Sequence, residues 1–207
     1  MWSSGKQPNF ICWVERRPFK VSFILSILYN IHSINKVFNS LGVANALAFD
    51  TLGLSPVDTV DVLTKVTKAT IIHGYTFTKA LEHSLKQCVS LGRQTNVLHF
   101  HSEGVTYYIW AHRDYQLWGK KLPLQCPQCG ILNPWMTTTV RGIDGYQLAC
   151  INNWCGRLEE GIIKERYGFQ VLRPVGGNLI PAGRESGGSA SGWLKLTTTE
   201  IYYNTLE

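Results

Sequence analysis

The feature that most limits how this chain can fold is a set of four cysteines arranged as two close pairs. Cys126 and Cys129 are separated by two residues, and Cys150 and Cys155, after an interval of 20 residues, are separated by four. Thiolates at such spacings can converge on one metal ion, and four of them at about 2.3 Å make the closed tetrahedral site of a structural zinc. The pattern therefore predicts one structural Zn²⁺ held by these four side chains.

Two other interpretations of the cysteines stay open at this point. Together with Cys12 and Cys88 the chain has six cysteines, an even number that would allow 15 disulfide connectivities. Tetrahedral thiolate sites also suit iron. The close pairing favours a metal over a covalent framework, and reduced thiols are typical of the cytoplasm and the nucleus. We therefore expect an intracellular protein.

The sequence around the cysteines resembles the zinc-ribbon family, with rubredoxin-like knuckles, over about residues 122–168. Pro127 lies between the first two cysteines, and Gly130 and Gly156 each follow the second cysteine of a pair. Strands are expected at residues 135–140, 146–149 and 157–166, with a turn at 142–145. The second pair departs from the family, which usually has two intervening residues there. No other part of the chain resembles a known family.

The resemblance implies a binding role, toward either nucleic acid or a protein partner. The chain carries 20 basic and 14 acidic side chains, a formal net charge of +6, but the excess is dispersed. Such a balance permits phosphate binding without requiring it. Basic and aromatic side chains close to the ribbon are the candidates for contact with DNA or RNA: Lys120, Lys121, Trp135, Arg141, Trp154 and Arg157.

The remaining residues predict an α/β fold, with α+β as the alternative, built on a small mixed sheet with helices. Apolar spacing and capping residues favour helices at 21–41, at 55–69 and from 76 to 92. Alternating apolar residues favour a hairpin at 96–112 and short strands at 10–14 and 70–73. We expect four parts: an irregular lead-in (1–20), a helical and α/β domain (21–112), the ribbon with its basic connector (113–173), and a Gly/Ser-rich linker and tail (174–207).

The apolar run at residues 21–31 has a second interpretation. It follows basic residues, as the core of a signal peptide does, but polar Asn30 and His32 stand where a cleavage site would be. Its apolar residues keep helical spacing into the following segment, so a buried helix is the preferred prediction. No apolar run approaches the length of about 20 residues that spans a bilayer, so no transmembrane segment is expected.

An enzyme, or a degenerate relative of one, is the alternative to a binding protein. His99 and His101 alternate on a predicted strand and would share one face, and His73 or Glu103 could complete a site with them. Cys88 lies on the apolar face of a predicted helix, where a buried thiol is expected rather than a nucleophile. The chain has no phosphate-binding loop, dinucleotide fingerprint or zinc-protease motif, so no small-molecule cofactor is evident.

Overall fold

The structure, a computed structural model, describes residues 10–15, 20–25, 31–50, 55–139, 145–156, 165–182 and 191–197, with side chains from residue 34 onward except at 139. The chain divides into two compact units: unit 1, residues 1–110 with 175–207, and unit 2, residues 111–174. The bounds predicted for the ribbon and its connector, 113–173, are close to those of unit 2. Residues 174–207 were predicted to be a separate linker and tail, but residues 175–207 belong to unit 1.

A sheet forms the centre of unit 1, with strands in the order β11-β12-β5-β4-β3-β1-β2. The pairs β1–β2, β1–β3, β3–β4, β4–β5 and β11–β12 are antiparallel. The strands span Phe10–Glu15 (β1), Lys20–Leu25 (β2), Asn45–Asp50 (β3), Asn96–His101 (β4), Gly104–His112 (β5), Asn178–Pro181 (β11) and Ser191–Thr197 (β12). The prediction of a fold that combines helices with a sheet is confirmed. Because these five strand pairs are all antiparallel, the fold corresponds to the predicted α+β alternative at these strands.

The described residues of unit 1 form four helices beside this sheet: α1 (Ile31–Ser40), α2 (Pro56–Ile71), α3 (Phe77–Leu85) and α4 (Val89–Gly92). Helix α2 begins where its sequence predicts, because Ser55 accepts a hydrogen bond from the Asp58 N–H at 3.5 Å and Pro56 follows the cap. The strand predicted at 70–73 is wrong, because the helix continues to Ile71, where the Thr70 hydroxyl donates to the Val66 carbonyl at 2.9 Å, and Ile72 is its C-cap. No helix in the described part of the chain is both long and apolar enough to cross a membrane.

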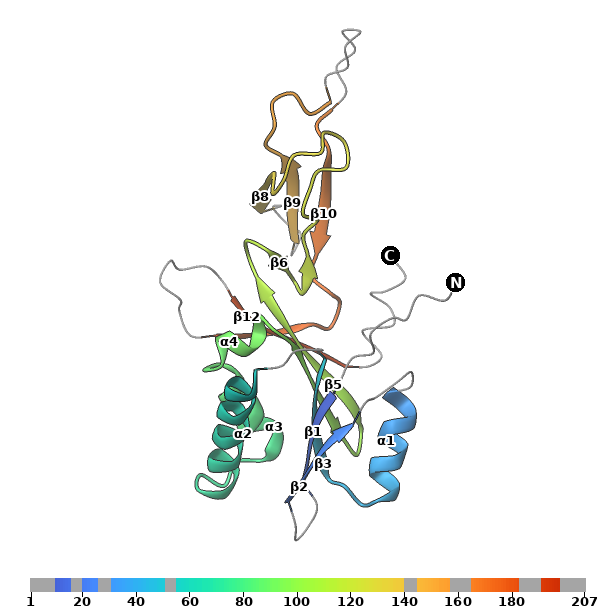
Figure 1. The fold of residues 1–207 in the computed structure, drawn as a ribbon, viewed down its shortest axis with the longest axis vertical. Coiled ribbons are helices and arrows are strands. Elements are labelled where there is room, and N and C mark those ends of the chain that lie inside the picture. Colours follow the sequence, from blue (N-terminus) through green and yellow to red (C-terminus); the bar gives the residue numbers. More distant parts are fainter. Residues whose placement is uncertain are drawn as a thin grey trace. The chain divides into compact units, whose positions relative to one another are not determined.

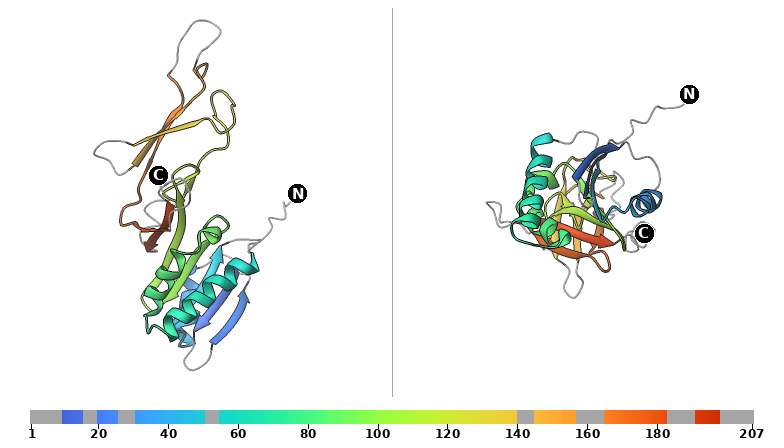
Figure 2. Two further views of the ribbon diagram at one scale, coloured as in Figure 1. Left: turned by 90° about the vertical axis from the view of Figure 1, so that its left-hand side faces the viewer. Right: turned by 90° about the horizontal axis from the view of Figure 1, so that it is seen from below.

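Helices cover both faces of the unit 1 sheet, with α1 on one side and α2 with α3 on the other (Figures 1 and 2). Successive strand residues point to opposite faces, so each strand contributes to two cores. On the α1 side, Ala46, Ala48, Leu98, Phe100 and Val105 pack with Phe38 and Val43. On the other side, the buried strand residues include Leu47, Phe49, Val97, Tyr108, Trp110, Ile180 and Trp193.

The predicted helix at 21–41 is wrong in its first half. Residues 20–25 form β2 and pair antiparallel with β1, and the helix begins only at Ile31. A short apolar run satisfies both helical and strand periodicity, so only a partner strand can decide between them. Here the segment at 10–15, correctly predicted as a strand, supplies that partner.

The predicted linker at 174–192 is also wrong, because β11 and the start of β12 lie within it. Trp193 is fully buried, and its indole N–H donates to the Leu85 carbonyl at 2.8 Å. A Cβ at Gly192 would lie 2.4 Å from the Ile180 carbonyl oxygen. This glycine therefore permits two strands to pack closely. Residues 183–190 of this segment lie outside the described residues.

Unit 2 contains a short hairpin and a separate three-stranded sheet. The hairpin pairs β6 (Gln116–Leu117) with β7 (Lys120–Lys121), and the antiparallel sheet has the order β10-β9-β8. Its strands are β8 (Trp135–Thr139), β9 (Gly145–Cys150) and β10 (Gly168–Leu172). The third strand was predicted at 157–166 and is found at 168–172 instead; residues 157–164 are outside the described part. Leu117, Leu148 and Val171 form the buried core.

Candidate metal centre

The four paired cysteines meet at one end of the three-stranded sheet of unit 2. Cys126 and Cys129 lie in the connection between β7 and β8, Cys150 is the last residue of β9, and Cys155 lies in the turn that follows. Their four sulfur atoms are all within 4.8 Å of one another. The Sγ–Sγ distance is 3.8 Å from Cys126 to Cys155 and 3.6 Å from Cys129 to Cys150.

These distances fit a tetrahedral metal site and exclude disulfides among the four. Zinc–sulfur bonds of about 2.3 Å in a regular tetrahedron place the sulfurs about 3.8 Å apart. A disulfide would bring two of them to about 2.05 Å. Cys126, Cys129, Cys150 and Cys155 are free thiols, three of them buried and Cys129 half-buried. The donor set could therefore hold one metal ion.

Both cysteine turns, which we call knuckle 1 (residues 126–130) and knuckle 2 (150–156), end in the same way. Gly130 and Gly156, each directly after a cysteine, have φ of +71° and +87°. That region is costly for a residue with a Cβ, so glycine is required for these turns. Within knuckle 1 the Gly130 N–H donates to the Cys126 carbonyl at 2.8 Å.

Backbone amides point at three of the four sulfurs. The N–H groups involved are those of Ile131 to Cys129, Asn152 to Cys150, and Tyr167 to Cys155. Hydrogen bonds to an ionised group are about twice as strong as those between neutral groups. The backbone around the site is thus arranged to receive thiolates.

The thiols differ in how easily they ionise. The Ile131 N–H, followed by the Asn152 amide, lowers the pKa of Cys129 to about 6. Burial raises the pKa of Cys150 to about 12 and also raises that of Cys155. A coordinated dication deprotonates a thiol outright, and this cluster matches that chemistry better than the chemistry of a free nucleophile.

The aromatic and basic residues predicted to contact nucleic acid do not behave alike. Trp135 is half-buried, contacts the rings of Tyr167 and Phe169, and donates its indole N–H to the Pro123 carbonyl at 2.6 Å. It packs against the small core of unit 2, and its contact with nucleic acid stays a prediction. Trp154 is 69% exposed. Lys120 and Lys121 are exposed on β7, and Arg141 and Arg157 lie outside the described residues.

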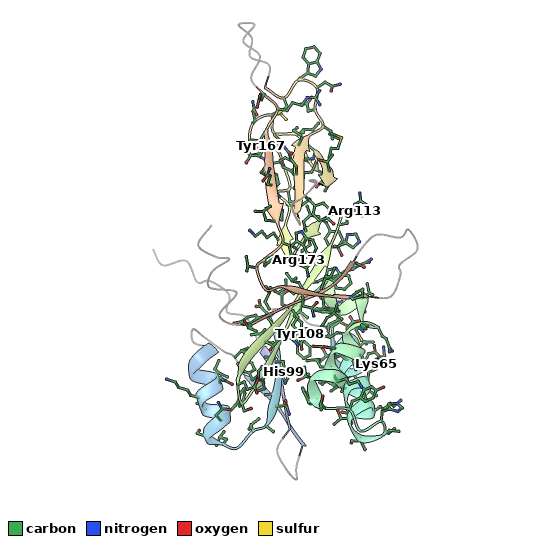
Figure 3. All side chains as sticks on the ribbon, turned by 180° about the vertical axis from the view of Figure 1, so that it is seen from behind. Lys65, His99, Tyr108, Arg113, Tyr167 and Arg173 are labelled. Atoms are coloured by element: carbon green, nitrogen blue, oxygen red, sulfur yellow. The ribbon has the colours of Figure 1, made fainter. Side chains whose placement is uncertain are left out.

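The described basic side chains gather mainly at the end of unit 2 opposite the cysteines. The Arg173 guanidinium lies 5.3 Å from the Trp118 ring, which lies 6.0 Å from the ring of Tyr146 near the start of β9. Cys150, four residues after Tyr146, ends the same strand about 14 Å away at about 3.4 Å per residue. Figure 3 shows Arg113 and Arg173 at one end of the unit and Tyr167 toward the other. The structure therefore does not bring Lys120 and Trp154 into one patch.

The described residues of the two knuckles and of strands β8 and β9 include no charged side chain. Residues 122–139 and 145–156 contain no Asp, Glu, Lys or Arg. Exposed apolar side chains lie in these segments instead: Leu124 (76%), Leu132 (68%), Ile151 (53%) and Met136 (51%), in addition to Trp154. The residue pattern alone shows this lack of charge, but only the structure shows that the apolar side chains are exposed.

The histidines of the enzyme alternative are only partly brought together, in unit 1. The rings of His99 and His101 are 5.0 Å apart, and His99 donates from Nε2 to Asn45 Oδ1 at 2.9 Å. His73 is exposed, with its ring 5.9 Å from that of Tyr75. Burial, His101 and Lys195 lower the pKa of His99 to about 3, which makes it a weak base.

In the part of the chain that the structure describes, neither a second metal site nor a reactive thiol accompanies these histidines. Among the described residues, the four cysteines are the only group of three or more His, Cys, Asp or Glu side chains arranged to hold a metal. Burial raises the pKa of Cys88 to about 12, as expected of an unreactive buried thiol. Its predicted place within one helix from 76 to 92 is wrong, because α3 ends at Leu85 and Cys88 caps the start of α4. Glu103 is exposed in the β4–β5 turn.

Comparison of the chain with models of protein families, with curated proteins and with solved structures finds no match.

Proposed function

We propose that unit 2 is a zinc module of the zinc-ribbon type, in which Cys126, Cys129, Cys150 and Cys155 bind one Zn²⁺. The observation that supports this is the sulfur geometry, with Sγ–Sγ distances of 3.6 and 3.8 Å against about 3.8 Å for a zinc tetrahedron. Four protein ligands complete the coordination of zinc and leave no position for water. The role of the ion is therefore structural.

Metal analysis of the purified full chain tests this proposal. Protein produced without added metal should contain about one equivalent of zinc and should be colourless. A coloured protein that contains iron would overturn the identity of the metal, because tetrahedral thiolate sites also accept iron. A metal-free protein whose unit 2 is fully folded would overturn the site itself.

The module serves, in this proposal, to dock another protein that presents an uncharged, apolar surface. Support comes from residues 122–139 and 145–156, which expose large apolar side chains and have no charge with which to bind phosphate. Exposed apolar clusters of this kind mark interaction sites. A shallow groove of about 540 Å³ beside knuckle 1, lined in part by the charged residues Glu165 and Arg166, borders this apolar surface and does not belong to it.

Photo-crosslinking in cells tests the docking surface. A photoreactive amino acid in place of Trp154 should capture a protein, whereas the same group in place of Lys68, exposed on α2 of unit 1, should not. Leu132→Asp should abolish the crosslink without loss of zinc. A crosslink that persists in Leu132→Asp would contradict the proposed surface.

Binding of nucleic acid is the second candidate function, supported by the adjacent exposed Lys120 and Lys121 with Arg113 and Arg173 at the same end of unit 2. Titration with single-stranded and duplex DNA and RNA at two salt concentrations separates the two roles. With three to five phosphate contacts, the log–log salt slope would be about −2 to −5. If unit 2 docks a protein instead, the chain should bind neither DNA nor RNA, even at low salt. Binding that Lys120→Glu with Lys121→Glu removes would favour nucleic acid.

A further inference from the structure

We propose that the side-chain amides of Asn152 and Gln128 are outer-shell donors to the metal site, each bound to a sulfur of the opposite knuckle. Asn152 belongs to knuckle 2 and reaches Cys129 of knuckle 1, whereas Gln128 belongs to knuckle 1 and reaches Cys155 of knuckle 2. The inference deepens the proposed function and rests on it. According to this inference, hydrogen bonds from two neutral amides to the thiolates connect the two knuckles.

The orientation of the Asn152 amide follows from its hydrogen bonds. Its Oδ1 accepts the backbone N–H of Trp154 at 3.0 Å, so the Nδ2–H₂ group is the one that faces the Cys129 sulfur, to which the side chain is hydrogen-bonded. The Asn152 backbone N–H donates to Cys150. One residue therefore donates to a sulfur in each knuckle.

Gln128 makes the reciprocal contact, with 3.7 Å between its Oε1 and the Cys155 sulfur. In that arrangement the thiol is the donor. A metal-bound cysteine is a thiolate with no proton, so the amide turns to present its Nε2–H₂ group. The terminal torsion of glutamine is broad and roughly two-fold, and the half-turn needs no movement of the backbone.

The unusual spacing of the second cysteine pair fits this role. Four residues separate Cys150 from Cys155, and within that loop the Asn152 side chain bonds the Trp154 N–H while its carbonyl accepts the Cys155 N–H at 3.0 Å. This turn directs the amide across to knuckle 1. The four-residue loop between Cys150 and Cys155 thus provides the side-chain amide of Asn152 as a donor. A loop of two residues offers fewer positions for such a side chain.

Measured zinc affinity of charge-matched variants of the full chain tests the inference. Asn152→Asp exchanges the donor for an acceptor of the same shape, and Asn153→Asp makes the same charge change one residue later, where Oδ1 accepts from Arg166 at 2.9 Å. Gln128→Glu is matched by Gln125→Glu, at another exposed glutamine beside knuckle 1. Each Kd for Zn²⁺ is obtained by competition with a chromophoric chelator.

Loss of an outer-shell partner typically weakens metal binding by about 10–100-fold. We expect that loss in Asn152→Asp and Gln128→Glu relative to their controls. The neutral variant Asn152→Ala should also bind zinc more weakly than Asn153→Ala, which separates loss of the donor from added charge. Equal affinities within each matched pair, in a chain that does bind zinc, would overturn this inference alone. A parent chain that binds no metal would overturn the proposed function, and this inference with it.

Discussion

Replacing Cys150 with serine should unfold unit 2 and leave unit 1 folded. Among the described residues, three apolar side chains, Leu117, Leu148 and Val171, form the buried core of the larger apolar cluster in unit 2. Burial of each contributes about 1.5–3 kcal/mol. Structural zinc contributes about 10–16 kcal/mol at pH 7. A compact unit of this size is stable by about 3–10 kcal/mol in total. Loss of a zinc ligand therefore removes more free energy than the total free energy of unfolding of unit 2.

Hydrogen exchange followed by mass spectrometry resolves the two units in the intact chain. In Cys150→Ser, and in the parent chain treated with a strong chelator, amides of β8, β9 and β10 should exchange at rates close to those of an unfolded chain. Amides of β3, β4 and α2 should keep their protection, because their core in unit 1 contains none of the four paired cysteines.

Cys88→Ser is the matched control, since it makes the same atomic change outside the cluster. Its hydroxyl can keep the hydrogen bond to Asp61 that the thiol makes at 3.4 Å. The control should retain zinc and protection in unit 2. Retained protection of β9 in Cys150→Ser, without bound zinc, would refute the reasoning that zinc carries the stability of this unit.

Three further outcomes are expected. The pKa of His99 in the folded state is about 3, below the unfolded value of about 6.5. Between these values the unfolded state binds more protons, so the free energy of unfolding falls as the pH falls, by about 2 kcal/mol at pH 5. Urea unfolding curves of His99→Gln should lack this pH dependence. Gly92→Ala should cost about 1–3 kcal/mol, because its Cβ would lie 2.3 Å from Cε3 of Trp110. Gly130→Ala, at φ +71°, should strain knuckle 1 by about 1–2 kcal/mol and weaken zinc binding about tenfold in chelator competition.

Each of these outcomes has a control within the chain. His73→Gln changes an exposed histidine and should keep the pH dependence of the parent. Gly92→Ala should cost less in a Trp110→Leu background, and an equal cost in both backgrounds would contradict the steric argument. Gly74→Ala, at φ +65° in unit 1, introduces comparable strain and should leave zinc affinity unchanged. A similar loss of affinity in that variant would show that the effect is not local to knuckle 1.

The parts of the structure that were predictable are those decided by local sequence. Two residues between Cys126 and Cys129 limit that turn to a tight knuckle, and Ser55 before Pro56 specifies the start of α2. The hairpin at 96–112 was predictable for the same reason, since its turn and both of its strands are contiguous. In each case residues close in sequence carry the whole signal.

The errors arose where a distant partner decides the conformation. The segment at 20–25 becomes a strand because β1 pairs with it. The segment at 178–181 becomes a strand because β12 pairs with it, and a composition rich in glycine serves close strand packing as well as it serves a linker. The contacts of Asn152 and Gln128 with sulfurs of the opposite knuckle were not predictable either, since they depend on how the two knuckles meet.

The position of unit 2 in the chain has a consequence for folding kinetics. β5 and β12 are neighbours in one sheet, yet residues 113–190, which include most of unit 2, separate them in sequence. Closing a flexible loop of that length costs about 4 kcal/mol of chain entropy. A zinc ion that joins Cys126 to Cys155 shortens the flexible path between the two strands before they pair. Refolding without zinc should therefore delay protection of β12 relative to β3 and β4, and zinc should shorten that delay while leaving the rate of β3–β4 pairing unchanged.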